Sequence, residues 1–90
     1  MEVTIPISNT ARRFGYVIWP RKYDDAVRKL LGAADTIEVV FDGQRLGQRR
    51  VSWRYRRISI GSSRTKGADP GSETFRLVMS SPEVLSVTME

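Results

Sequence analysis

The sequence predicts a mainly β domain of the α+β class, a small barrel or rolled antiparallel sheet of about six strands with one α-helix. Short segments with alternating apolar residues, rich in β-branched and aromatic side chains, recur between turn residues. A single segment shows the three-and-four spacing of an amphipathic helix. The chain has 90 residues, of which 40% are hydrophobic and 28% charged, so we expect residues 1–90 to form a single folded domain.

Two strands are expected before the helix. Val3–Ile7 alternates branched aliphatic residues with others, and Pro6 favours a position at the edge or end of a sheet. We expect residues 8–13 to form a loop or a bulged continuation of this strand. Phe14–Pro20 is rich in aromatic and β-branched residues, so we expect a second strand that the proline ends.

The helix is expected over about residues 22–31. Apolar side chains recur there at spacings of three and four, which gives one apolar face. Asp24 and Asp25 lie in the first turn and two basic residues in the last, as the helix dipole favours. Gly32 is a natural residue to end the helix, because it can adopt a left-handed conformation.

A long hairpin is expected after the helix. Its first strand is Thr36–Phe41, which has apolar residues at alternate positions. Asp42 and Gly43 form a hairpin dipeptide, because both residues tolerate positive φ. The returning strand contains the stretch RRVSWRYRR at residues 49–57.

Alternation within this stretch predicts a buried face and a basic face. The face turned to the core is expected to carry three residues, Val51, Trp53 and Tyr55. The opposite face is expected to carry a ladder of arginines about 20 Å long, Arg50, Arg54 and Arg56. The alternation then changes frame at Arg57, and Ile58 and Ile60 take the opposite parity, so we expect a bulge or sharp bend near residues 56–57.

The last third of the chain is expected to contribute a loop and two strands. Residues 61–72 have the composition of a flexible loop. Residues 73–79 and 84–89 each alternate apolar residues, with the turn sequence SSPE between them.

The residue types that are absent exclude several kinds of chemistry. The chain has no cysteine and no histidine, which excludes disulfides, thiolate zinc sites and the usual nucleophilic triads. The neighbouring carboxylates Asp24 and Asp25 diverge by about 100° on a helix and do not converge on one ion. We therefore expect no enzyme, no catalytic residues, no metal site and no cofactor.

The sequence also carries no sign of a membrane segment. There is no run of about 18 apolar residues, and the first residues lack the basic-then-apolar order of a signal peptide. We expect a cytoplasmic protein with no membrane partner and no small-molecule substrate.

The positive charge is concentrated in the middle of the chain. The net charge is +5, but residues 43–68 hold eight of the 15 basic residues and no acidic residue. The remainder holds seven basic and ten acidic residues. Such an uneven distribution indicates a polyanion as a partner, and arginine matches phosphate with two parallel hydrogen bonds.

The predicted nucleic-acid-binding residues follow from this segment. They are Arg45, Arg49, Arg50, Arg54, Arg56, Arg57, Arg64 and Lys66. Two aromatic residues, Tyr55 and Trp19, are candidates for stacking on bases if their rings are exposed beside the arginines.

Residues 16–43, YVIWPRKYDDAVRKLLGAADTIEVVFDG, resemble the core of the AbrB/SpoVT (MazE-like) swapped-hairpin family, whose wider kin are the cradle-loop and double-psi barrels. Trp19-Pro20 stands where that family has IP, Leu31-Gly32 matches LG, and Ala34-Asp35 replaces GD. The resemblance implies a cradle-loop-like barrel and DNA binding in transcription regulation. Family members contact DNA mainly in and before the first strand, where this chain has Arg12 and Arg13.

The sequence thus favours a small regulatory or accessory protein that contacts the phosphates of nucleic acid through an arginine-rich hairpin, with DNA favoured over RNA. The alternative is a protein-interaction module whose basic face meets an acidic partner, or a structural homo-oligomer such as a homodimer. Salt-dependent binding to oligonucleotides separates the two.

Overall fold

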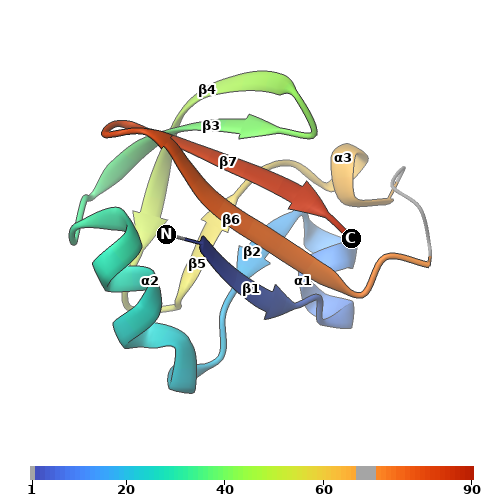
Figure 1. Ribbon diagram of the computed structural model, residues 1–90. Helices are drawn as coiled ribbons and strands as arrows, with labels where there is room; N and C mark the ends of the chain where they lie inside the picture. Colours follow the sequence, from blue (N-terminus) through green and yellow to red (C-terminus); the bar gives the residue numbers. More distant parts are fainter. Residues whose placement is uncertain (1, 67–70) are drawn as a thin grey trace.

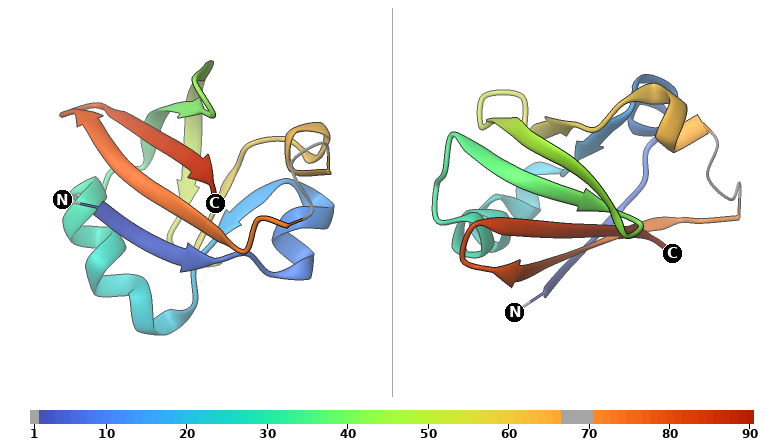
Figure 2. Two further views of the ribbon diagram at one scale, coloured as in Figure 1. Left: turned by 45° about the vertical axis from the view of Figure 1, so that its right-hand side comes forward. Right: turned by 90° about the horizontal axis from the view of Figure 1, so that it is seen from above.

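The computed structural model describes residues 2–66 and 71–90 and confirms the predicted mainly β fold (Figure 1). All seven strands of the described residues belong to one sheet, which curls into a half-barrel (Figure 2). None of the helices in the described part of the chain has the length and apolar character needed to cross a membrane.

The elements follow one another in the order β, α, β, then a 3₁₀ turn and a helix, three strands, a helix and two strands. Their bounds are β1 Glu2–Pro6, α1 Asn9–Phe14, β2 Tyr16–Ile18, η1 Arg21–Tyr23, α2 Asp24–Leu31, β3 Thr36–Phe41, β4 Gln44–Ser52, β5 Arg57–Ser59, α3 Ser62–Lys66, β6 Thr74–Ser81 and β7 Val84–Met89. The predicted helix over residues 22–31 is confirmed as η1 and α2, and Gly32 ends it with φ +64°.

The strand order is β1-β6-β7-β3-β4-β5-β2, and one pair of neighbours is parallel. β3 lies parallel to β7, with Val39 opposite Leu85, whereas the other neighbours are antiparallel. The expectation was a small barrel or a rolled antiparallel sheet, and the parallel pair departs from the antiparallel arrangement at this seam. Alternation shows which face of a strand is buried, but it carries no information on the direction of a partner distant in sequence.

The concave face of the sheet holds one core. Its largest fully buried side chains are Trp19 and Phe75, and both β3 and β7 turn alternate residues toward it. Helix α2 adds three buried side chains to the same cluster, Val27, Leu30 and Leu31. In Figures 1 and 2, α2 lies at the left end of the molecule, and α1 and α3 lie together at the right end.

The segment expected to be a loop at residues 8–13 is a short helix, α1. Ser8 accepts a hydrogen bond from the backbone N–H of Ala11 at 3.0 Å, and Gly15 ends the helix with φ +74°. Ala11 is the buried residue of this helix, so the segment has too few apolar positions to show a helical period.

The loop expected over residues 61–72 contains the helix α3. Thr65 is fully buried in it and donates a hydrogen bond to the carbonyl of Arg12 at 2.6 Å, which fixes α3 against α1. Residues 67–70 of the expected loop lie outside the described residues.

The bend expected near residues 56–57 is a complete reversal of the chain. Strand β4 ends at Ser52, residues 53–56 form a turn, and β5 returns antiparallel with Ser52 opposite Arg57. Arg56 has φ +53° in this turn, a left-handed conformation that allows the tight reversal. The predicted burial of Tyr55 is therefore wrong, since 56% of this residue is exposed, and Trp53 is half-buried.

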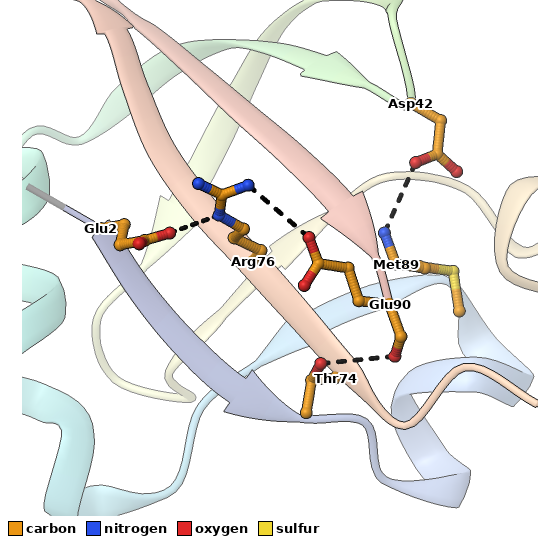
Figure 3. A network of polar contacts seen from close by, with 6 residues as sticks. All are labelled: Glu2, Asp42, Thr74, Arg76, Met89 and Glu90. Atoms are coloured by element: carbon orange, nitrogen blue, oxygen red, sulfur yellow. Dashed lines mark hydrogen bonds and ion pairs between the residues drawn. The ribbon is translucent and has the colours of Figure 1, made fainter.

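The convex face near the chain ends is held by charges that neutralise one another (Figure 3). Arg76 on β6 pairs with Glu2 on β1 and lies 3.7 Å from the carboxylate of Glu90, which follows β7. The hydrogen bond with Glu2 raises the pKa of Arg76 above its ordinary value. Thr74 donates a hydrogen bond to the carbonyl of Glu90 at 3.3 Å. Arg76 therefore lies inside a polar network of its own chain.

Candidate functional site

An open pocket of about 620 Å³ lies where β4 passes into the turn of residues 53–56. Residues 50–55, Arg57 and Asp35 line it. We call the arginines Arg50, Arg54 and Arg57 together with Tyr55 the turn cluster. Several predicted binding residues therefore meet at one concave place on the surface.

Backbone pairing and buried neighbours hold the two strands that carry the turn cluster. Val51 lies opposite Ile58, and both are buried in the core. The hydroxyl of Ser52 accepts a hydrogen bond from the backbone N–H of Tyr55 at 3.3 Å. The carbonyl of Arg56 accepts one from the N–H of Trp19 at 3.0 Å, which ties the turn to the end of β2.

Asp24 fastens the turn to the start of helix α2. Its carboxylate accepts hydrogen bonds from the Trp19 indole Nε1 at 2.8 Å and from the Arg56 Nε at 2.9 Å. The hydrogen bond from Arg56, followed by that from Trp19, lowers the pKa of Asp24 below its ordinary value. The ionised carboxylate is therefore the form that fits this turn.

Trp53 fastens the other side of the turn. Its Nε1 donates to the carbonyl of Ala34 at 2.9 Å, and the Arg28 guanidinium lies 4.8 Å from its ring. Its ring also meets that of Trp19 edge to face, with the centroids 5.6 Å apart. With both of its flanks fixed, the turn presents Tyr55 outward on a rigid support.

Arg57 lies against two tyrosine rings. Its guanidinium carbon is 4.3 Å from the ring centre of Tyr16 and 4.9 Å from that of Tyr55. Arg54 reaches the Tyr55 ring from 5.4 Å. These distances are within the range of cation–π attraction, which orients the guanidinium groups without neutralising their charge.

The turn cluster has more positive charge than its surroundings offset. Asp35 is the carboxylate that lines the pocket with the three arginines. Within the part of the chain that the structure describes, Arg45, Arg56 and Arg76 form ion pairs, whereas the three arginines of the turn cluster form none. A bound anion would therefore meet guanidinium groups that no carboxylate already occupies.

Several of the other predicted binding residues are placed elsewhere. Arg45 lies near the opposite end of β4 and pairs with Glu38 at 2.5 Å. Arg49 lies opposite the buried Ile37, and its half-buried side chain has an Nε without a hydrogen-bond partner. Arg56 is engaged by Asp24, so none of these three arginines belongs to the pocket.

The expected ladder of Arg50, Arg54 and Arg56 on one strand face is wrong. The strand ends at Ser52, so these arginines belong to a strand and a turn and share no face. Trp19 is 1% exposed, so it offers no ring face for stacking. For Arg64 and Lys66 the structure describes the backbone, and their side chains lie outside what it describes.

Sequence reasoning missed four residues that shape the site, Tyr16, Asp24, Arg28 and Asp35. The helix dipole by itself accounts for Asp24 in the first turn of α2 and for the basic residues of the last turn, of which Arg28 is one. Tyr16 lies next to the buried Val17 in β2. Because neighbouring residues of a strand face opposite sides, this position was the signal that the Tyr16 ring faces away from the core. Their contacts join segments far apart in the chain.

The side chains around the pocket are of kinds that bind anions and flat rings. Within residues 2–66 and 71–90, no three acidic side chains gather closely enough to hold a metal ion. The site offers guanidinium groups, an exposed phenol ring and a hydroxyl. Comparisons with family models, with curated proteins and with solved structures give no match to this chain.

Proposed function

We propose that this protein binds nucleic acid through the turn cluster, with Arg50, Arg54 and Arg57 contacting phosphates. The observation that carries the proposal is the gathering of three arginines without carboxylate partners around one pocket, beside an exposed aromatic ring. Guanidinium groups recognise phosphate through paired hydrogen bonds, and this recognition does not require a base sequence.

The exposed ring favours nucleic acid over an acidic protein surface. A row of carboxylates would satisfy the arginines equally well, but it would leave Tyr55 without a partner of matching shape. Nucleic acid supplies phosphates and flat bases in regular succession. A cytoplasmic regulatory or accessory role, in line with the resemblance to the AbrB/SpoVT family, completes the proposal.

The test is a salt titration of binding to a labelled oligonucleotide. If about three phosphates are contacted, log affinity should fall with log salt concentration at a slope of about −2 to −3. The double variant Arg50→Ser, Arg54→Ser removes two exposed charges of the turn cluster and should reduce both the affinity and the slope.

The matched control is Arg21→Ser, Lys29→Ser, which removes the same charge from exposed residues that do not line the pocket. The control should bind nearly as well as the parent protein. Equal losses in both variants would indicate attraction by net charge alone, and no binding at low salt would leave an acidic protein as the partner.

A further inference from the structure

Tyr55 is a large aromatic residue that the fold displays instead of burying. It is 56% exposed at the outer part of the turn, although it follows Trp53, which is packed against the core. A buried position would have been favourable for a ring of this size. The exposed ring therefore needs an explanation that the core does not supply.

The ring is supported in a defined orientation. Arg57, on strand β5 and half-buried, lies between the rings of Tyr55 and Tyr16. The backbone of Tyr55 is held by the hydroxyl of Ser52 at 3.3 Å. Less ordering is required of such a ring when a flat ligand stacks on it, because its position is already fixed.

Arg54 is the second cation beside the Tyr55 ring. This residue is exposed and lies in the turn, where its guanidinium carbon is 5.4 Å from the Tyr55 ring. A flat ligand can take the place of the Arg54 guanidinium on the ring, while the charge of Arg54 remains next to the ligand. Arg50 lines the same pocket from the end of β4.

We propose that the turn cluster takes an unpaired nucleotide, with its base stacked on Tyr55 and its neighbouring phosphates on Arg50 and Arg54, and that the protein selects single-stranded nucleic acid over duplex. This inference rests on the proposed function. In a duplex the base faces are covered by their neighbours, so the ring gains a stacking partner when the strand is single. The arginines alone would not make this distinction.

The experiment compares four probes of about 12 nucleotides, a length within the usual site sizes for single strands. The probes are single-stranded DNA, single-stranded RNA, duplex DNA and a DNA strand of the same length with abasic sites. They are titrated into the parent protein, Tyr55→Ala and Tyr55→Phe. The phenylalanine variant is the matched control because it keeps the ring.

The parent protein should prefer single strands to duplex. Tyr55→Ala should weaken binding of single-stranded DNA by about 5-fold to 150-fold, the loss of one stacked base. The same variant should bind the abasic strand as the parent does, because that strand offers phosphates without bases. Tyr55→Phe should stay within about 2-fold of the parent on every probe.

Two results separate this inference from the function on which it rests. If duplex and abasic strands bind as tightly as the single strand and Tyr55→Ala changes none of them, the stacking site is refuted while phosphate binding stands. If no probe binds at low salt, the proposed function itself is overturned. Where single strands do bind, the ratio of the DNA affinity to the RNA affinity distinguishes the two sources of single strand.

Discussion

At the scale of single residues, Asp24 connects the candidate site to the rest of the fold. Its carboxylate joins three segments, because it starts helix α2 and accepts hydrogen bonds from Trp19 and from Arg56 in the turn. A carboxylate with two such donors is stabilised in its ionised form. The geometry of the turn therefore depends on the charge of one side chain.

This dependence predicts an effect of pH on stability. The pKa of Asp24 is lower in the folded protein than its ordinary value of 3.8, so its contribution is present above that value and is lost as the pH falls below it. Asp24→Asn keeps the shape and removes the charge. Urea unfolding should show the parent more stable than this variant at neutral pH, with the difference shrinking below pH 3.8. A difference that stays constant with pH would contradict the assignment.

The two tryptophans should contribute unequally to stability. Trp19 is 1% exposed and fills the core, whereas Trp53 is half-buried at its margin. We expect Trp19→Ala to cost about 3–5 kcal/mol of unfolding free energy and Trp53→Ala a smaller amount. Chemical denaturation of both variants measures this, and a larger loss for Trp53→Ala would contradict the burial described above.

At the scale of elements, the strongly periodic segments were predictable. The helix over residues 22–31 and the strands at 36–41 and 84–89 have apolar positions that repeat with one period throughout, and the structure confirms them. Helices α1 and α3 were missed because each has few residues and buries its side chains through contacts with the other. Tertiary packing decides such short segments more than propensity does.

The candidate site was predictable in composition and not in geometry. The acid-free segment indicated where charge gathers, and Arg50, Arg54, Arg57 and Tyr55 do share a pocket. The assumption of one continuous strand placed Tyr55 inside and Arg56 outside. The turn reverses this, because Arg56 adopts a left-handed conformation and reaches Asp24.

Gly15 provides a test of how α1 is joined to β5. Its φ is +74°, and an added methyl group would collide with the backbone of Gly61 and Ser62, where the chain leaves the sheet for α3. Gly32, with φ +64° and nothing near its added methyl group, is the matched control. Gly32→Ala should cost about 1–2 kcal/mol, from backbone conformation alone. Gly15→Ala should cost at least about 1 kcal/mol more, because packed backbone must move.

Thermal or urea unfolding of the two glycine variants gives the comparison. Equal losses would mean that the connection after β5 can move away from Gly15 without cost. This would also weaken the account of Ile60 and Gly61, whose N–H groups both donate to the carbonyl of Gly15, at 2.7 and 3.1 Å.

At the scale of the whole molecule, the parallel seam joins two groups of strands. β1, β6 and β7 lie on one side of it, and β3, β4, β5 and β2 on the other. Both groups turn their apolar residues into the same cluster, so the halves share a core. Small domains with one core unfold in a single cooperative step.

The variant Leu85→Ala tests whether the two groups of strands unfold together. Leu85 is fully buried on β7 and lies across the seam from Val39, and its loss should cost about 2–5 kcal/mol. Both tryptophans lie on the other side of the seam from Leu85. Their fluorescence should nevertheless show the same shift of the unfolding midpoint as far-ultraviolet circular dichroism. Transitions that separate between the two signals would indicate halves that unfold independently.

The edge-to-face pair of Trp19 and Trp53 makes it possible to follow the conformation of the turn by spectroscopy. At 5.6 Å the two indoles are close enough for their electronic transitions to couple, and one of them belongs to the turn. The two tryptophans are therefore an intrinsic spectroscopic probe of the turn. The near-ultraviolet dichroism of the two indoles should fade whenever the turn detaches from the core.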